Sequence, residues 1–319
     1  MGTLRGEETM TILYVLFNIL AFAFLAPLVQ GVIKKTKAYL QMRQGPPVMQ
    51  MYADLKKYWQ KETIVSKNAS VIFLLAPYIV FTVIVVIALL IPSFNGEAPL
   101  ASWGDFILVL YLFAFARFFL ALAGIDAGSP FGGMGSSREM MFSSLVEPAF
   151  FATLLGLALR THSMNLATIS YGLSKFGLEV LSPAHIFALA AALIVLVAET
   201  GRIPVDNPDT HLELTMVHEA MILEYSGKEL ALMHWSATIK QLILLSLVAN
   251  LFFPWGIAFT GFVGFIVGGV LFLVKVFALA LLLALIETAL VKFRIFKVPD
   301  LLAMAFLLAI LAILAQYYL

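Results

Sequence analysis

The chain has 319 residues, of which 62% are hydrophobic and only 12% are charged, and its formal net charge is +1. Soluble domains carry roughly 25% charged residues, so this composition excludes an ordinary soluble protein and indicates an integral membrane protein. The chain has no cysteine, which excludes disulfides, thiolate metal ligands and a cysteine-held iron–sulfur or nickel centre, and it has no basic cluster that would indicate nucleic-acid binding.

Apolar runs long enough to cross a hydrocarbon core of ~30 Å recur along the whole chain. The chain shows no internal repeat, low-complexity segment or linker, and we therefore predict one all-α polytopic membrane domain over residues 1–319. The first run lacks a basic flank and a clear cleavage site, so we expect a retained helix and not a signal peptide. About eight transmembrane helices are expected, at residues 10–33, 70–92, 103–123, 140–160, 183–199, 233–253, 262–290 and 300–318.

Lysine and arginine are distributed unequally between the loops on the two sides of the membrane. One side receives Arg5, Arg160 and Lys175, whereas fourteen such residues fall on the other side. Because cytoplasmic loops carry an excess of Lys and Arg, we expect the richer side to be cytoplasmic and both termini to lie outside. The cytoplasmic loops are expected at about 34–69, 124–139, 200–232 and 291–299.

The first cytoplasmic loop contains an amphipathic pattern. In VMQMYADLKKYWQK, residues 48–61, apolar and aromatic positions recur at helical spacing with lysines on the other face, which favours a helix lying at the membrane surface. Before it, Gly45-Pro46-Pro47 predicts a rigid turn just after Arg43. This turn favours a docking platform for a partner, and the alternative is that the basic residues anchor the loop to lipid.

The second loop, GIDAGSPFGGMGSSRE at residues 124–139, is rich in glycine. Its glycines match neither a dinucleotide fingerprint nor a P-loop, because no strand precedes them and no Lys-Ser/Thr follows. We expect the glycines to permit turns and the close approach of this loop to another surface. Ser136 or Ser137 is expected to cap a helix that begins with Arg138 and Glu139.

The third loop is the most polar segment and is acidic. Its histidines, His211 and His218, are seven residues apart, and not the three or four that would bring two ligands together on adjacent turns. A solvated acidic helix is therefore favoured over a metal site, and a proton or cation path is a further interpretation. The acids, against Arg202 and Lys228, are Glu199, Asp206, Asp209, Glu213, Glu219, Glu224 and Glu229.

Ionisable residues inside the expected spans are costly and indicate function by default. They are Arg117, Glu147, Lys240, Lys275 and Glu287. At a rise of 1.5 Å per residue, the first three lie roughly 10–12 Å from the cytoplasmic ends of their helices, the last lies nearer that surface, and Lys275 lies near mid-membrane.

The fourth span carries a ladder of polar residues, because Glu139, Ser143 and Glu147 step by four and share one helix face. Pro148 removes a helix hydrogen bond beside Glu147. Buried carboxylates beside lysines exchange protons near neutral pH, because desolvation and neighbouring charge act on them in opposite directions. The ladder thus favours a proton relay, and the alternative is that these charges pair for structure or reach the surface along their alkyl stems.

Four stretches occur in this order on the cytoplasmic loops: RQGPPVMQMYADLKK, SREMMFSSLVEP, AETGRIPVDNPDTHLELT and LEYSG. Together they resemble the NuoH/ND1-like family, which includes the membrane subunit of respiratory complex I that abuts its peripheral arm. AGIDAGSPFGGMGSSREMM and HLELTMVHEAMILEYSG look most like the hydrogenase branch, the membrane subunits of energy-converting nickel–iron hydrogenases and formate hydrogenlyases. The resemblance extends from about Lys34 to Asp300.

The resemblance implies an eight-helix subunit in the cell membrane of a prokaryote, clamped under a hydrophilic redox arm. It implies no cofactor on this chain and places a nickel–iron centre and iron–sulfur clusters on the large and small subunits of the peripheral arm. Antiporter-like membrane subunits are the other implied partners. The implied role is that of a membrane anchor that links electron transfer in the arm to translocation of H⁺ or Na⁺.

Several motifs of this chain match positions that are functional in the family. Glu147 falls on the family's span-4 glutamate, and Glu139 looks particular to the hydrogenase branch. The spacing from Glu213 to Glu224 is longer than in the quinone-reducing branch, which leaves the equivalence of those motifs open. Resemblance and residue pattern together indicate a relay of Arg117, Glu139, Glu147, Glu199, Asp206, Glu213, Glu219, Glu224, Lys240, Lys275 and Glu287. The residues expected to dock the peripheral arm are Arg43, Gly45, Pro46, Arg138, Lys292 and Arg294.

Three alternatives stay open at this point. The same fold serves in complex I-type quinone-reducing complexes and in sulfur-reducing complexes. A self-contained cation transporter is a second alternative, although such proteins usually show repeated halves that this sequence lacks. The third is a passive structural anchor, in which the buried charges are only ion pairs.

Overall fold

The computed structural model describes residues 2–66, 69–207, 216–257 and 261–318. Within these ranges seven helices are long and apolar enough to cross a membrane, and a further apolar helix, α7, has 17 residues. These eight helices correspond to the eight expected spans, and the all-α membrane fold class is confirmed. They are α1 (Gly2–Leu40), α3 (Val71–Leu90), α4 (Phe106–Asp126), α5 (Pro130–Thr161), α7 (Pro183–Glu199), α9 (Gly227–Phe252), α10 (Gly261–Ala289) and α11 (Val298–Tyr318).

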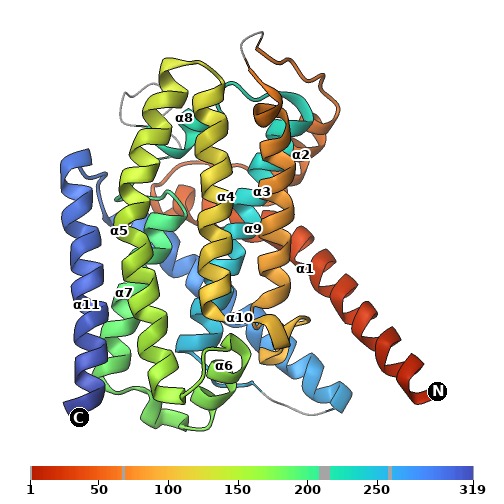
Figure 1. Cartoon of the computed structure of the whole chain (residues 1–319), viewed down its shortest axis with the longest axis vertical. Coiled ribbons are helices and arrows are strands. Elements are labelled where there is room, and N and C mark those ends of the chain that lie inside the picture. The colour runs from red at the N-terminus through yellow and green to blue at the C-terminus, as the bar shows by residue number, and fades with distance from the viewer. Residues whose placement is uncertain (1, 67–68, 208–215, 258–260, 319) are drawn as a thin grey trace.

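Short helices connect the long ones. At one end of the molecule lie α2 (Gln50–Trp59) and α8 (His218–Ile222), and we call this the α2/α8 end (Figure 1). The opposite end carries both chain termini and α6 (Leu166–Ser174), and we call it the terminal end. Single 3₁₀ turns occur at η1 (Phe94–Gly96), η2 (Ala101–Trp103), η3 (Gly177–Val180) and η4 (Ile295–Lys297).

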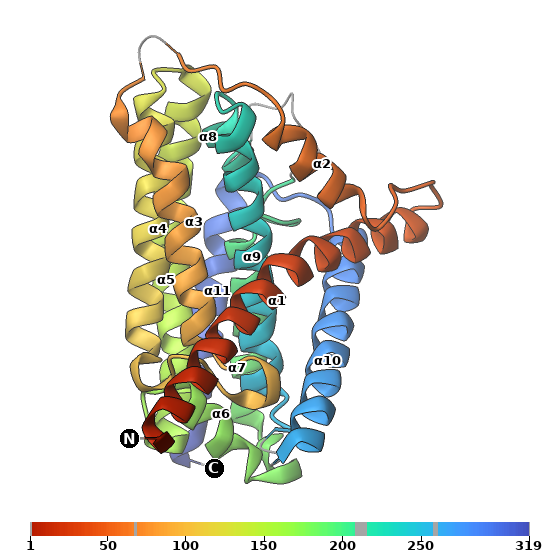
Figure 2. The same cartoon turned by 90° about the vertical axis from the view of Figure 1, so that its right-hand side faces the viewer.

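Helix α9 lies at the centre of the bundle. It packs against α1, α3, α7 and α10, and 83% of its membrane span is buried inside the chain. It therefore meets protein instead of lipid around most of its circumference. Helices α3, α4, α5, α7 and α11 stand around it, whereas α1 leans away towards its N-terminus and α10 stands to one side (Figures 1 and 2).

The amphipathic pattern of the first loop does form a helix. Helix α2 packs against α1 and α9 but has no fully buried residue, as expected for a helix at the edge of the bundle. Helix α1 continues to Leu40, well beyond the expected end of the first span at residue 33. Lys37 explains the extension, because its side chain is 8% exposed and its ammonium lies 3.3 Å from the Glu287 carboxylate.

The glycine-rich stretch 124–139 is not the loop that we predicted. Helix α5 already begins at Pro130, and the side chain of Ser129, not Ser136 or Ser137, caps it by accepting from the Gly132 amide. A proline at the first helical position has the helical φ and lacks the amide that would be left unpaired there, so this start is favoured locally. The Ser136 hydroxyl instead donates to the Ala121 carbonyl at 2.8 Å and joins α5 to α4.

The glycines serve the close approach that we expected, between helices of the same chain. A Cβ on Gly132 would lie 2.2 Å from the Gly124 carbonyl oxygen, and one on Gly124 would lie 2.5 Å from the Ser136 hydroxyl. Gly135 approaches α8 in the same way, because a Cβ there would lie 2.8 Å from the Val217 carbonyl oxygen. These contacts hold α4 and α5 together beside α8 at the α2/α8 end.

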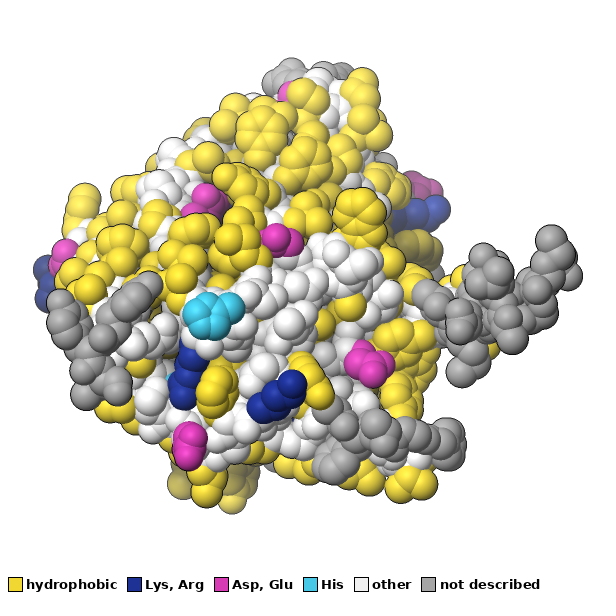
Figure 3. All heavy atoms as spheres, turned by 60° about the horizontal axis from the view of Figure 1, so that its bottom comes forward, with side chains coloured by type: hydrophobic (Ala, Val, Ile, Leu, Met, Phe, Trp, Pro, Cys, Tyr) yellow, Lys and Arg dark blue, Asp and Glu magenta, His cyan; other side chains and the backbone are white. Residues whose placement is uncertain are grey.

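The terminal end is poor in charge. In Figure 3 its described surface shows mostly hydrophobic and uncharged atoms, with isolated charged side chains. Here Asn250 of α9 donates to the carbonyls of Pro92 and Ser93, at 2.9 Å each, and Asn18 of α1 donates to the Ser93 hydroxyl at 2.7 Å. Polar side chains therefore satisfy the backbone where α3 ends, as burial of such groups requires.

Candidate functional site: a buried charge cluster

Arg117 of α4 is the centre of a charge cluster inside the bundle. Its guanidinium lies 2.5 Å from Glu147 and 3.4 Å from Glu139, both on α5, and 2.5 Å from Glu199 at the end of α7. Contact of Glu139 and Glu147 with one guanidinium shows that the predicted ladder does face one side. Glu199 also lies 2.7 Å from the Lys240 ammonium of α9. We call these five residues the Arg117 cluster.

The carboxylates of the Arg117 cluster differ in exposure. The Glu199 side chain is 4% exposed, that of Glu139 is 20% and that of Glu147 is 46%. The cluster thus leads from an enclosed carboxylate to one at the edge of the protein. With every member ionised, its three carboxylates and two cations leave one negative charge in excess.

A second cluster forms around Arg202, just beyond α7. Its guanidinium donates to Glu287 of α10, to Gln30 of α1 and, at 2.8 Å, to Gln241 of α9. Lys37 adds its ammonium 3.3 Å from Glu287. Among the members of this Arg202 cluster, the sequence singled out Glu287 alone. We counted Arg202 and Lys37 as loop charges, and the signal missed was the pair of glutamines, Gln30 and Gln241, within apolar helices.

Asp206 connects the start of the acidic loop to the start of α8 and to the last loop. One oxygen lies 3.3 Å from the Lys292 ammonium, and the other accepts from the amides of Val217 and His218 at 3.2 and 3.3 Å. Arg138 acts nearby, donating to the Met216 carbonyl at 2.9 Å. Lys292 and Arg138, both expected to dock a partner, therefore make contacts within this chain.

The remaining docking residues lie on the surface of the α2/α8 end. Arg43 is exposed, and its Nε donates to Gln41 at 2.8 Å. Pro46 and Arg294 are also exposed, and the Gly45 carbonyl accepts from Lys35 at 3.4 Å. These residues are placed where a partner on that side would meet them.

The other predicted relay residues are dispersed. Glu219 lines a cavity described below, whereas Glu224 is exposed. Lys275 is half-buried at the middle of α10, and within the described residues no ion pair reaches it. Glu213 lies outside the described residues.

Tyr225 and Glu229, close to Glu224 in the chain, make contacts that stabilise the fold. The Tyr225 ring stacks on Phe73 with 4.0 Å between ring centroids, and its hydroxyl donates to the Phe73 carbonyl at 2.7 Å. Burial, helped by the negative charges of Asp126 and Glu229, raises the pKa of Tyr225, so the hydroxyl keeps the proton that this bond needs. Glu229 in turn accepts from Thr63 at 2.5 Å and joins the first loop to α9.

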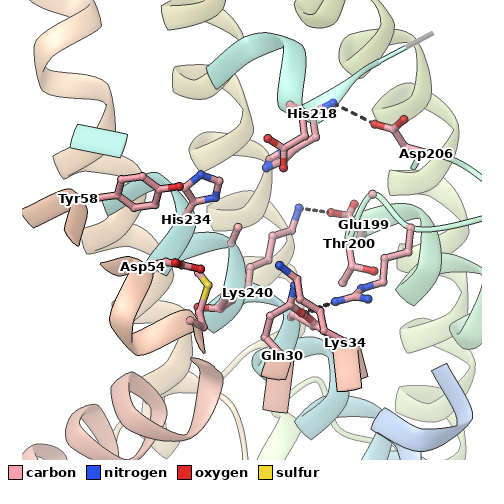
Figure 4. Close-up of a pocket in the computed structure, with 17 residues that line it drawn as sticks. Gln30, Lys34, Asp54, Tyr58, Glu199, Thr200, Asp206, His218, His234 and Lys240 are labelled. Atoms are coloured by element: carbon pink, nitrogen blue, oxygen red, sulfur yellow. Dashed lines mark hydrogen bonds and ion pairs between the residues drawn. The ribbon is translucent and has the colours of Figure 1, made fainter. Parts of the chain in front are cut away.

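A polar cavity of about 320 Å³ connects the two clusters (Figure 4). Glu199 and Lys240 reach it from the Arg117 cluster, and Gln30, Arg202 and Gln241 from the Arg202 cluster. On the α2 side, Tyr58 stacks on His234 of α9, with ring centroids 5.7 Å apart and an interplanar angle of 17°. Further lining residues include Lys34, Asp54, Asp206, His218 and Glu219.

The sequence did not indicate this cavity. Asp54 and Tyr58 belong to the pattern that predicted an amphipathic surface helix, and no pattern in the sequence singled out His234. In the structure, burial and the nearby acids Asp54 and Glu219 raise the pKa of Tyr58. Within the described residues, no group of three His, Asp or Glu side chains is arranged to hold a metal ion.

Residues 12–317 match the model of a family described as NADH dehydrogenase. The chain belongs to this NuoH/ND1-like family. Formate hydrogenlyase subunit 4 of Escherichia coli is 34% identical over 295 residues, which cover 91% of this chain and 94% of that protein. Hydrogenase-4 component C of E. coli is 33% identical and 94% of each chain is covered. The expected hydrogenase branch is thereby confirmed.

The quinone-reducing branch of the family is more distant. An NADH-quinone oxidoreductase subunit of Pelagibacter ubique is 29% identical over 272 residues, covering 81% of this chain and 78% of that protein. A chain of the archaeal membrane-bound sulfane sulfur reductase shares the fold, with a TM-score of 0.79 at 20% identity over 95% of this chain and 99% of that one. These relatives support the expectation that this family member is a multi-pass membrane subunit of a respiratory complex.

Proposed function

We propose that this chain is the membrane anchor and energy-coupling subunit of a hydrogenase complex, and that it links electron transfer in a peripheral arm to H⁺ or Na⁺ translocation. Two relatives that match nearly its whole length are named as parts of formate hydrogenlyase and hydrogenase-4. Since this chain has no cysteine, the iron–sulfur clusters and the nickel–iron centre belong to partner subunits. Antiporter-like membrane subunits would carry the translocated ion.

The observation that carries this proposal is the Arg117 cluster. Three carboxylates share one guanidinium, with distances of 2.5 to 3.4 Å, and the most enclosed of them also contacts Lys240. A cluster with one charge in excess responds to a nearby change of charge by taking up or releasing a proton. Reduction or oxidation of a centre in an adjoining arm would change the charge near the cluster. The cluster would respond to this charge because Coulomb interactions are strong where water is scarce.

The position of the Arg117 cluster supports this uptake or release of protons. Glu199 and Lys240 border the polar cavity, which adjoins α2 and α8, whereas Glu147 lies at the edge of the protein. In the proposed sequence of events, an arm bound over Arg43, Pro46 and Arg294 moves the segments that line the cavity. The carboxyl groups around Arg117 then change protonation, and the change passes towards the neighbouring ion-carrying subunits.

Replacing Glu147 with Gln tests the proposal. The substitution keeps the size of the side chain and its place beside Arg117 but removes a charge and a proton site. We expect hydrogen turnover with a soluble artificial electron carrier to stay within about twofold, while ion uptake into inverted vesicles falls roughly tenfold or more. The matched control is Glu179→Gln, because Glu179 is exposed in η3 and belongs neither to the cluster nor to the predicted relay. Undiminished uptake in the Glu147 variant contradicts the relay and favours a passive anchor held by ion pairs.

Two further measurements separate the remaining alternatives. Nickel in the purified complex distinguishes a hydrogenase from a quinone-reducing or sulfur-reducing relative, because only the hydrogenase needs nickel. Ion flux through the isolated chain in liposomes would identify a self-contained transporter. We expect one nickel per complex and no such flux.

A further inference from the structure

Lys275 stands at the middle of α10, fourteen residues from either end of this helix (Gly261–Ala289). At a rise of 1.5 Å per residue it lies roughly 21 Å from each end. A ~30 Å hydrocarbon core puts its centre about 15 Å from either surface, which is beyond the reach of a four-carbon lysine stem. Its ammonium therefore stays at the depth where a charge is most costly.

Other cations deep in this chain have carboxylates. Arg117 contacts three, Lys240 lies 2.7 Å from Glu199, and Lys37 lies 3.3 Å from Glu287. Among the described residues, no carboxylate lies within 4.0 Å of Lys275. Within the described part of the chain, the other deep cations thus have a counter-charge and this one does not.

The surface beside Lys275 is apolar and faces outward. Leu271, Ala278 and Leu282 stand four before, three after and seven after it, so all share its side of the helix. Leu271 is half-buried, Ala278 is exposed and Leu282 is 38% exposed. A small residue such as Ala278 lets another helix approach closely, and α10 itself stands to one side of the bundle (Figure 2).

We propose that Lys275, Ala278 and Leu282 form an interface with a transmembrane helix of another subunit, and that this helix carries an Asp or Glu at mid-membrane depth. Charge complementarity selects the partner: a lone ammonium in hydrocarbon is costly, whereas one paired with a carboxylate inside a helix interface is not. The inference rests on the proposed membership in a multi-subunit membrane complex but not on ion translocation.

Photo-crosslinking in the intact complex tests the interface. Benzoylphenylalanine at Leu282 should give a protein adduct, and the adduct peptide should contain an Asp or Glu about two helical turns from the attachment point, because Leu282 lies seven residues from Lys275. The matched control is Leu307 of α11, which is 61% exposed and should give mainly lipid adducts. Lipid adducts alone at position 282, no protein adduct, or a partner segment without a carboxyl group would each overturn the proposal.

Charge exchange tests the pair itself. Lys275→Met should lower the amount of the crosslinked subunit that co-purifies by roughly tenfold, because it leaves the partner's carboxylate unpaired. Removing that carboxylate as well, by the corresponding Asn or Gln substitution, should restore assembly. A double variant no better than Lys275→Met contradicts the pairing. These readouts are independent of ion uptake, so a Glu147→Gln variant that still pumps leaves this inference standing.

Discussion

At the scale of single residues, the chemistry of this protein depends on which charged groups share a partner. Arg117 is 6% exposed and contacts three glutamates from two helices. A guanidinium presents five donors in one plane, so a single arginine can hold several carboxylates, which a lysine ammonium does less well. Three acids of the predicted relay, which the sequence suggested beside lysines, therefore surround an arginine, and Lys240 is a second cation on Glu199.

Arg117→Met should destabilise the protein strongly. Removing one partner of a buried ion pair costs about 3–5 kcal/mol, because the remaining charges stay buried without compensation. The loss should shrink at acidic pH, where protonated carboxyl groups need no counter-charge. Thermal unfolding of the purified complex at neutral and acidic pH measures this effect, with Arg117→Lys as the control that keeps the charge. An unchanged unfolding midpoint in the Met variant would show that the cluster contributes little to stability.

At the scale of elements, helix contacts at the α2/α8 end position the charge cluster. The early start of α5 at Pro130 carries Glu139 along a continuous helix to Glu147, and its glycines let it lie against α4, which bears Arg117. The distances within the cluster depend on this approach, because α4 and α5 supply three of its five residues. Helix α8 then covers the junction, with Met216 held by Arg138.

Gly132 and Gly133 differ only in what they face, so they form a matched pair. A Cβ at Gly132 would meet the Gly124 carbonyl oxygen at 2.2 Å, whereas a Cβ at Gly133 would have nothing within 4 Å. Gly132→Ala should separate α4 from α5, lower the unfolding midpoint and weaken ion uptake. Gly133→Ala should be neutral or slightly stabilising, because alanine favours the helix by roughly 0.8–1 kcal/mol over glycine. Equal effects of the two substitutions would contradict a role for close helix approach.

At the scale of the whole molecule, the ends of the bundle differ in kind. Both termini lie at one end, where the described surface has few charges, while the basic and acidic loops lie at the other (Figures 1 and 3). This asymmetry agrees with the distribution of lysine and arginine along the chain. We therefore expect the α2/α8 end to face the cytoplasm.

The absence of native cysteine makes this orientation simple to test. Met42 is 96% exposed at the α2/α8 end, and Leu178 is 78% exposed in η3 at the terminal end. In intact cells with a permeabilised outer layer, a membrane-impermeant maleimide should label Leu178→Cys and not Met42→Cys. Inverted vesicles should give the opposite pattern unless the bound arm covers residue 42, which stripping the arm would reveal. Reversed labelling would place both termini in the cytoplasm.

The hydrophobic pattern of the sequence was sufficient to predict the number and order of the apolar helices, because every segment that crosses a bilayer must be apolar for about twenty residues wherever it packs. The spacing of Glu139 and Glu147 likewise predicted a shared face, since that geometry belongs to a single helix. Contacts between helices far apart in the chain decide which cation those acids meet. The same kind of contact brings Glu287, Gln30 and Gln241 together on Arg202. Such contacts leave no periodic trace in the sequence, because they are set by the packing of whole helices against each other; only the tertiary structure could assign them.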